Sequence, residues 1–451
     1  MLEKIFKLKE NNTNVRTELL AGCTTFVAMA YIVIVNPAIL AVSGIDQSAV
    51  FTATIVAAAI GTLIMAFYAN VPYAQAPGMG LNALFAYTIC AGLGFRWQEA
   101  LAIVFICGII NIIFTVTRLR KMLIKAIPSF MQHAIGAGIG LFIAYVGIKN
   151  ADLILFSVSN VESGVAAASS VNPFIAVFNN PNIILSLIGL VITAILVVNK
   201  IKGSLLFGII ITTLIGIPLG VTNLQSFGAL TPTLSPTLFK LDIASLLSME
   251  AGMIVVIMTI FTLSLSDIFD SIGTFIGTGQ RSGIFQGELE NDKKLQKALY
   301  ADSVATSIGA LLGTSNTTTY VESAAGISVG GRTGLTSLFT ALLLLLSLLF
   351  APFIAAIPAA ATAPALIIIG VMMMDSVLNI DWKDVIVAIP AFFVIAFMPF
   401  SFSITVGVQM GFIFYVIIKI VTGKYKEVHP ILYVFVFLFV FEFVYKAIHS
   451  L

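Results

Sequence analysis

Charged residues are scarce in this chain of 451 residues. Lysine, arginine, aspartate and glutamate together make up 10% of the sequence, whereas hydrophobic residues make up 59%. An average soluble protein is about 25% charged. Because so few charges cannot cover a water-facing surface, the composition excludes a soluble globular protein. The formal net charge is only +2, and the basic residues fall in short loops, so no nucleic-acid partner is expected.

Cysteine is also rare. Cys23, Cys90 and Cys107 lie in or beside apolar runs, without C-x-x-C spacing and without nearby histidines. Zinc sites and disulfide frameworks need clustered or paired cysteines. The sequence shows no nucleophile grouped with a base and no cluster of metal ligands, one of which an enzyme would need. We therefore expect neither a metal nor a cofactor, and no catalytic residue.

Long apolar runs are what the sequence does contain. Many approach the roughly 17 to 25 residues that a helix needs to cross a bilayer. The expected spans are residues 19–43, 49–69, 80–94, 98–117, 130–148, 182–198, 203–219, 251–279, 296–312, 322–331, 334–356, 360–377, 384–399 and 402–421. A further apolar stretch, residues 430–448, either crosses the membrane or lies along the bundle. The pattern predicts an all-α polytopic membrane protein with about fourteen transmembrane segments.

Basic residues in the short loops fix the expected direction of the spans. Lysine and arginine concentrate in cytoplasmic loops, and here they recur on every second side when the amino terminus is placed inside. The loop residues that follow this rule are Arg118, Arg120, Lys121, Lys125, Lys200, Lys202, Arg281, Lys293, Lys294, Lys297, Lys424 and Lys426. We expect a multi-pass protein of the plasma or inner membrane with a cytoplasmic N-terminus.

The two halves of the chain carry a weak internal repeat. Pro128 and Gly140 recur at the same spacing as Pro358 and Gly370, each pair opening the fifth helix of a seven-span half. Since seven is odd, the second copy must be inverted in the membrane. Inverted repeats of this kind are typical of secondary transporters.

The third element of each half is short and interrupted by helix-breaking residues. The first reads VPYAQAPGMG over residues 71–80, and the second reads TTTYVESAAG over residues 317–326. Such paired segments predict discontinuous helices that meet at the bilayer midplane with the substrate between them. We expect an extended stretch in each, followed by a half-helix whose N–H groups face the cargo.

Four acidic residues do not fit the solvated-surface reading that suits most of the acids: Asp267, Asp270, Asp302 and Glu322. Placing a carboxylate at membrane depth costs about 2.5 to 3.5 kcal/mol on insertion scales, so each needs a partner or a purpose. Asp267, Asp270 and Thr274 share one helix face by their spacing. A structural network between helix ends is the alternative, which suits Asp267 and Asp302 better than the other two.

Paired carboxylates suit a flat, neutral heterocycle with ring N–H and amino donors. An ionised carboxylate accepts two such hydrogen bonds in one plane, and charge-assisted bonds are about twice as strong as neutral ones. A buried carboxylate can also hold a proton near neutral pH. We therefore expect Asp270 and Glu322 to bind the cargo, and Asp267, Asp302 or Glu322 to carry a coupled proton.

Four ordered motifs resemble the adenine, guanine and hypoxanthine permease branch of the nucleobase:cation symporters. They are AGCTTFVAMAYIVIVNP at residues 21–37, APGMGLNA at 76–83, FDSIGT at 269–274 and the stretch from GTS to ESAAG at 313–326. The resemblance covers nearly the whole chain and implies a uracil-permease-like fold. The implied parts are a cytoplasmic N-terminus at 1–18, a core domain at 19–129 and 250–357, a gate domain at 130–249 and 358–422, and a C-terminal apolar segment at 423–451.

The resemblance also implies roles for single residues. Asp270 matches the glutamate that holds the base, Glu322 matches the acidic or amide residue that opens the tenth helix, and Asp302 matches an aspartate of purine relatives. Thr274 stands where uracil permeases carry a histidine linked to proton coupling. The full set expected to bind substrate is Asp270, Glu322, Thr274, Ala76, Gly78, Gly80, Ser323 and Ala324.

The expected function is import of a purine base, namely guanine, hypoxanthine or adenine, by proton symport and alternating access. Sodium coupling, and a homodimer formed through the gate helices, remain open. The alternatives are a transporter of small anions such as sulfate on the same fold, a transporter of uracil or xanthine, and a channel. A Q-N-x-G motif would favour xanthine, but the chain has Glu322-Ser323 instead.

Overall fold

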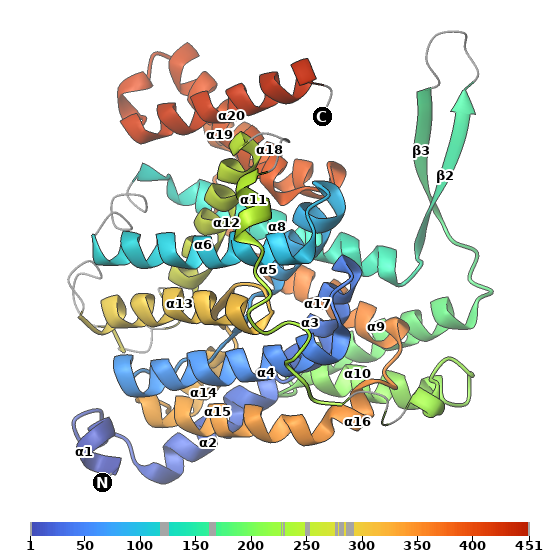
Figure 1. Cartoon of the computed structure of the whole chain (residues 1–451), viewed down its shortest axis with the longest axis vertical. Coiled ribbons are helices and arrows are strands. Elements are labelled where there is room, and N and C mark those ends of the chain that lie inside the picture. Colours follow the sequence, from blue (N-terminus) through green and yellow to red (C-terminus); the bar gives the residue numbers. More distant parts are fainter. Residues whose placement is uncertain are drawn as a thin grey trace.

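The computed structural model describes residues 2–117, 126–161, 168–226, 228, 231–248, 253–275, 278, 284–285 and 293–449. Among these residues, nine helices are long and apolar enough to cross a membrane, and several shorter apolar helices accompany them. Most of them run side by side across the view of Figure 1. Five of the expected cytoplasmic basic residues lie outside the described residues: Arg118, Arg120, Lys121, Lys125 and Arg281.

The elements of the first half follow the predicted spans closely. They are α1 (Leu2–Phe6), α2 (Val15–Met29), α3 (Ile32–Leu40), α4 (Gln47–Ile64), β1 (Gln75–Pro77), α5 (Met79–Ala83) with its π-helical continuation Leu84–Gly92, α6 (Trp97–Val116), α8 (Ser129–Asn150), β2 (Ile154–Val161), β3 (Ala168–Ile175), α9 (Pro181–Val198) and α10 (Ser204–Gly216). Every span expected in residues 19–219 therefore contains a helix.

The second half repeats this succession. Its elements are α11 (Ile243–Ser248), α12 (Met253–Thr274), α13 (Lys293–Leu312), β4 (Thr317–Thr319), α14 (Ser323–Val329), α15 (Gly334–Leu346), α16 (Ala351–Ile354), α17 (Ala359–Met373), α18 (Val385–Phe400), α19 (Ile404–Val421) and α20 (Pro430–His449). The extended stretches expected at the third and tenth elements are β1 and β4. The predicted fold class is confirmed.

The residues that suggested the repeat pack against one another. Pro128 and Pro358 are the N-caps of α8 and α17, where the lack of an N–H carries no penalty. A Cβ on Gly140 would lie 2.8 Å from the Gly370 carbonyl oxygen, and one on Gly370 would lie 2.4 Å from the Gly140 oxygen. The two fifth-position helices thus cross at matched glycines, an approach that small residues permit between membrane helices.

The first predicted span is broken, which the sequence reading did not anticipate. Helix α2 ends at Met29 and α3 begins at Ile32. The break leaves Tyr31 between the two helices, with 1% of its surface exposed.

The segment between α8 and α9 forms a β-hairpin. Strands β2 and β3 pair antiparallel with Ile154 opposite Ile175, and the hairpin stands away from the helical body (Figure 1). Valine, isoleucine, phenylalanine and serine in these strands suit an extended chain. The apolar stretch at the C-terminus is a helix, α20, which packs on α19 and α12.

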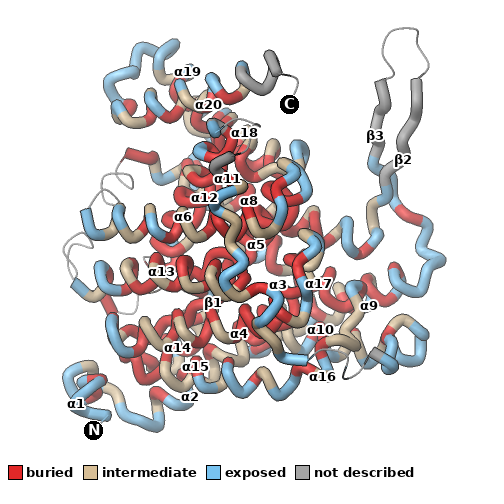
Figure 2. Tube along the Cα trace, viewed as in Figure 1, coloured by how far each residue is buried: buried red, intermediate tan, exposed pale blue. Residues whose placement is uncertain are grey.

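The helices contact one another in two groups. Helix α6 packs on α12 and α13, α2 packs on α14 and α15, and α4 packs on α13 and α15. Helix α8 packs on α17 and α18, and α9 packs on α10 and α17. Buried residues gather in the middle of the bundle, around β1, α5, α8 and α12 (Figure 2), where the two broken elements meet.

Candidate functional site

Strands β1 and β4 join the two broken elements at the centre of the bundle. They pair antiparallel, with Ala76 opposite Thr318 and Pro77 opposite Thr317, and all six of their residues are buried. Pairing satisfies backbone groups that lipid could not satisfy. The antiparallel arrangement also places two half-helices, α5 and α14, on either side of this short sheet.

The two half-helices differ at their N-termini. The first three N–H groups of α14 donate to the carbonyl oxygens of residues 320–322 at 2.9 to 3.1 Å. The expectation that these groups face a cargo is therefore not met at α14. Among the described residues, the N–H groups of Met79, Gly80 and Leu81 at the start of α5 have no backbone partner, so α5 alone offers free donors there.

Asp302 binds the sheet to two helices. Its Oδ1 accepts hydrogen bonds from the Thr319 N–H and the Thr319 hydroxyl, both at 2.9 Å. Its Oδ2 accepts from the Ser271 hydroxyl at 2.6 Å, and the Gln75 amide lies 3.4 Å from Oδ1. The side chain is 1% exposed. Asp302 thus holds α13, α12, β4 and β1 together.

Asp267, which lies in α12 one turn before Ser271, has a similar role. Its Oδ2 accepts hydrogen bonds from the Asn111 amide at 2.8 Å and from the Thr306 hydroxyl at 3.4 Å. The residue is 0% exposed. It therefore connects α12 to α6 and α13. This is the structural role that the sequence analysis gave as the alternative to a function in transport.

Asp270, one helical turn after Asp267, is only partly buried. Among the described residues, none donates a hydrogen bond to its carboxylate, which interacts electrostatically with Asp302 and Glu322. A Cβ built on Gly78 would lie 3.4 Å from Asp270 Oδ2 and 2.5 Å from a methyl of Thr318. The missing side chain at residue 78 therefore lets the β1–α5 turn approach this carboxylate.

Glu322, directly before α14, is the second partly buried carboxylate. Its Oε1 accepts a hydrogen bond of 2.6 Å from the Tyr31 hydroxyl at the break between α2 and α3. Tyr320 lies two residues earlier and donates to the Pro77 carbonyl at 2.6 Å. Glu322 and Asp270 together are called the carboxylate site below.

The other predicted binding residues lie around this centre with different contacts. The Ser323 hydroxyl accepts a hydrogen bond from the Ala74 N–H at 3.0 Å, so it fastens α14 to the chain before β1. A Cβ on Gly80 would lie 2.4 Å from a methyl of Ile139 in α8. Thr274 is buried one turn beyond Asp270, Ala76 is buried in β1, and Ala324 is partly buried in α14.

Three buried residues were not predicted from the sequence, and two of them, Tyr31 and Tyr320, lie at the site. Tyr31 and Tyr320 were passed over because an aromatic residue in an apolar run is typical of packing. Glu18 was counted with the polar terminus, yet it is 0% exposed. Its carboxylate accepts from the N–H groups of Arg332 at 3.0 Å and Thr336 at 3.0 Å, at the start of α15. An acidic residue just before the first apolar run was the available signal for this cap.

The arrangement offers two acceptor groups without enough donors of their own. A ligand that supplies N–H groups in one plane would complete their hydrogen bonding, and charge-assisted bonds of this kind are strong. An anionic ligand would be repelled by both carboxylates. No group of three metal-ligating side chains occurs among the described residues.

Comparison with known proteins agrees with this chemistry. The sequence profile of the Permease family matches residues 16–410. The chain belongs to this permease family. Its relatives include "Putative permease MJ0326" of Methanocaldococcus jannaschii, 43% identical over 98% of each chain. "Guanine/hypoxanthine permease PbuO" of Bacillus subtilis is 41% identical over 96% of this chain and 98% of its own. "Adenine permease AdeP" of Escherichia coli is 39% identical over 95% and 93%, respectively. The resemblance to the purine branch of these permeases is confirmed.

Solved structures of more distant proteins share this fold. The transmembrane domain of the cyanobacterial bicarbonate transporter BicA superposes with a TM-score of 0.63 at 18% identity, covering 88% of this chain and 97% of that domain. The murine anion transporter Slc26a9, in its inward-facing state, has a TM-score of 0.63 at 13% identity, covering 90% and 68%. At these identities the likeness shows the fold alone. The protein is a multi-pass membrane permease.

Proposed function

We propose that this permease imports purine nucleobases, binding guanine, hypoxanthine or adenine at the carboxylate site. The observation that carries the proposal is a difference in exposure and hydrogen bonding between two pairs of acids. Asp267 and Asp302 are buried and accept hydrogen bonds from neighbouring side chains. Asp270 and Glu322 are partly exposed at the junction of the broken elements. A purine edge, with its ring N–H and amino donors, fits two such acceptors.

The relatives support the same substrate class, since their names specify adenine, guanine and hypoxanthine. A small anion, the cargo named for BicA and Slc26a9, would meet two carboxylates. Among the described residues, no cationic side chain is hydrogen-bonded to either of them. Competition by unlabelled sulfate against radiolabelled hypoxanthine separates the two cargoes. Sulfate is expected to leave the uptake unchanged.

Transport coupled to a proton gradient is the second part of the proposal. Of the candidates Asp267, Asp302 and Glu322, the first two already stabilise helix contacts through their carboxylate oxygens. Among the side chains that the structure describes, only the Tyr31 hydroxyl donates to Glu322, and it bonds only Oε1. We assign the coupled proton to Glu322. Uptake that depends on sodium and survives a protonophore would overturn this assignment.

We propose that the two helix groups described above move against each other, so that the site opens alternately to each side of the membrane. One group is a core (residues 19–129 and 250–357) and the other is a gate (residues 130–249 and 358–422). The contact of Gly80 in α5 with Ile139 in α8 lies on the boundary between them. It brings the residues next to the carboxylate site directly against the opposing group. We place the N-terminus in the cytoplasm of a plasma or inner membrane, with dimerisation through the gate helices.

The direct test is uptake of radiolabelled guanine, hypoxanthine and adenine into cells that lack their own purine uptake. Glu322→Gln and Asp270→Asn are expected to reduce uptake strongly because each substitution removes a charged acceptor. Glu427→Gln is the matched control, since Glu427 pairs with Lys419 at the bundle surface. Wild-type uptake by a normally folded Glu322→Gln protein would contradict the site assignment.

A further inference from the structure

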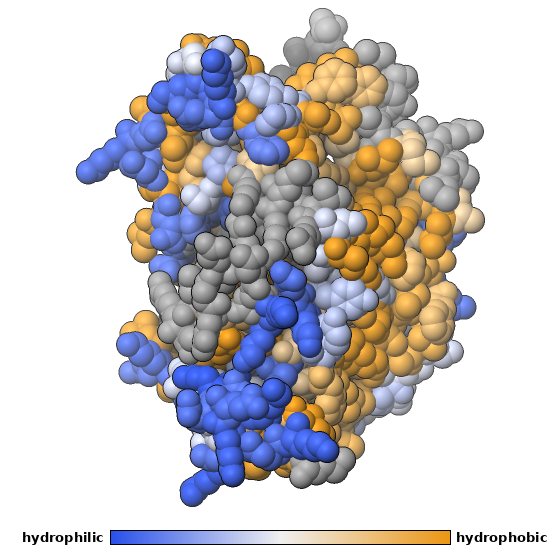
Figure 3. Space-filling model, turned by 90° about the vertical axis from the view of Figure 1, so that its left-hand side faces the viewer, coloured by the Kyte–Doolittle hydropathy of each residue, from blue (hydrophilic) through white to orange (hydrophobic). Residues whose placement is uncertain are grey.

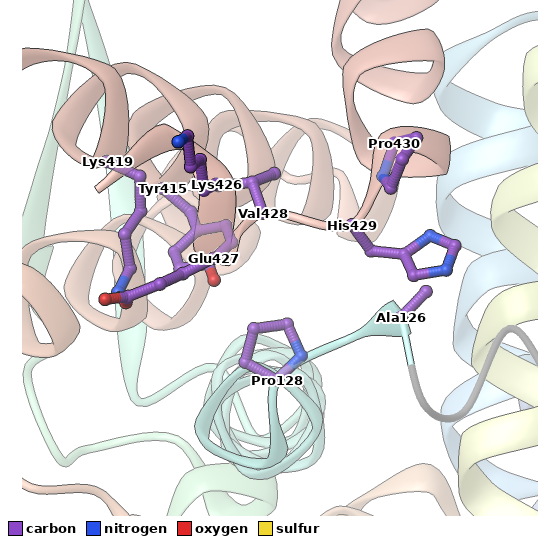
Figure 4. Close-up of a pocket in the computed structure, with 9 residues that line it drawn as sticks. All are labelled: Ala126, Pro128, Tyr415, Lys419, Lys426, Glu427, Val428, His429 and Pro430. Carbon is purple, nitrogen blue, oxygen red and sulfur yellow. The ribbon is translucent and has the colours of Figure 1, made fainter. Parts of the chain in front are cut away.

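A cavity of about 480 Å³ lies away from the carboxylate site, where α8 and α20 begin and α19 ends. None of the residues assigned to purine transport lines it. Figure 4 shows its wall above α8, seen nearly end-on, with the Lys419–Glu427 pair on one side and His429 on the other. Its volume falls in the range of about 300 to 1,000 Å³ that is usual for small-molecule sites.

The charges around this cavity favour an anion. Lys419 and Lys426 line it, together with His429 and one acid, Glu427. Glu427 is balanced by Lys419, whose ammonium lies 2.5 Å from its carboxylate, and this hydrogen bond holds the pKa of Glu427 below its ordinary value. Among the described residues Lys426 has no ion pair, so the cavity retains an uncompensated positive charge.

A buried donor also lines the cavity without a partner. Tyr415 is 4% exposed, and among the described residues no hydrogen bond to its hydroxyl is made. At the start of α8, a helix of 22 residues, the N–H groups of Ser129 and Phe130 likewise have no partner among the described residues. A helix N-terminus with free N–H groups attracts phosphate. A cation, a buried hydroxyl and the start of a helix thus border the same cavity, and each of them favours a phosphate.

The surroundings place this ligand in the membrane. Hydrophilic residues gather on the face of the molecule that carries the N-terminus and the α19–α20 turn (Figure 3). Beside the cavity, Ile417, Ile420 and Val421 of α19 are exposed by 47%, 50% and 80%, which is the pattern of a lipid-facing surface. A headgroup in the cavity would leave its acyl chains along this apolar face.

We propose that the cavity binds the phosphate headgroup of an anionic phospholipid in the leaflet on the N-terminal side. Basic pockets between membrane helices on the cytoplasmic side bind such headgroups. The Lys426 ammonium and the Tyr415 hydroxyl are assigned to the phosphate, and the Lys419–Glu427 pair forms the outer wall. The proposal does not depend on which base the carboxylate site carries.

The test uses the purified full-length protein in detergent, titrated with phosphatidylglycerol and followed by native mass spectrometry. Removing one lysine near the membrane surface is expected to weaken binding about fivefold, so Lys426→Gln should show this loss. Tyr415→Phe keeps the ring and removes the hydroxyl, and it should also bind more weakly. Lys202→Gln, the same charge change in the α9–α10 loop, should bind as the wild type does.

Two further arms distinguish the sources of the phosphate. Phosphatidylcholine with the same acyl chains is expected to bind more weakly than phosphatidylglycerol, and inorganic phosphate is expected not to displace the lipid. Equal binding of phosphatidylglycerol by the wild type, Lys426→Gln and Tyr415→Phe would overturn the proposal. Displacement of the lipid by inorganic phosphate would overturn the lipid assignment and leave a site for a free anion.

Discussion

Replacing Asp302 by alanine should destabilise the protein, because this carboxylate holds the β1–β4 sheet to the neighbouring helices. The substitution leaves the Thr319 N–H and hydroxyl and the Ser271 hydroxyl without their acceptor. The Ser271 hydroxyl can turn to Thr318, whose oxygen is already 2.8 Å away. The Thr319 N–H cannot turn, and a buried unpaired donor costs about 1 to 3 kcal/mol.

We therefore expect the apparent melting temperature of detergent-solubilised Asp302→Ala to fall by several degrees, with a lower yield of folded protein. Asp302→Asn keeps one oxygen for the Thr319 N–H and should lose less. Glu322→Gln, whose amide oxygen can still accept from Tyr31, should melt as the wild type does. An Asp302→Ala protein with the wild-type melting temperature that has lost only its response to the proton gradient would refute this reasoning.

Two other substitutions probe the boundary of the site. Gly80→Ala would set a methyl 2.4 Å from Ile139 and should slow uptake. Adding Ile139→Ala should restore part of the rate. An unchanged rate in the Gly80→Ala variant would contradict a tight contact there. Tyr31→Phe removes the hydroxyl that bonds Glu322 at 2.6 Å. Because that bond fixes one oxygen of the carboxylate, the pH profile of uptake should shift while the melting temperature changes little. An unshifted profile would separate Tyr31 from proton coupling.

The positions of the helices could be predicted from the sequence, because a bilayer dictates the length and apolarity of each span. The broken elements were also predictable, since Pro72, Pro77 and the threonines at 317–319 oppose a continuous helix. The matched glycines Gly140 and Gly370 followed from the repeat and proved to be in contact. These features depend on local rules that each half obeys separately.

Hydrogen-bond partners could not be predicted in the same way. Asp270 and Asp302 are both acids inside spans, and only the fold shows that Asp302 meets Thr319 while Asp270 meets the glycine turn at Gly78. The break beside Tyr31 coincides with the hydrogen bond from its hydroxyl to Glu322, a partner 291 residues away in the sequence. In the hairpin between α8 and α9, polar and apolar residues alternate too irregularly for the sequence to distinguish two strands from a loop.

The central claim, that Asp270 and Glu322 bind the base, is tested most directly by equilibrium binding of radiolabelled hypoxanthine to purified protein. Losing one charge-assisted hydrogen bond should weaken binding about 10- to 150-fold. Glu322→Gln and Asp270→Asn should each show this loss at an unchanged melting temperature, and Glu427→Gln should show none. Wild-type affinity in both site variants would contradict the account.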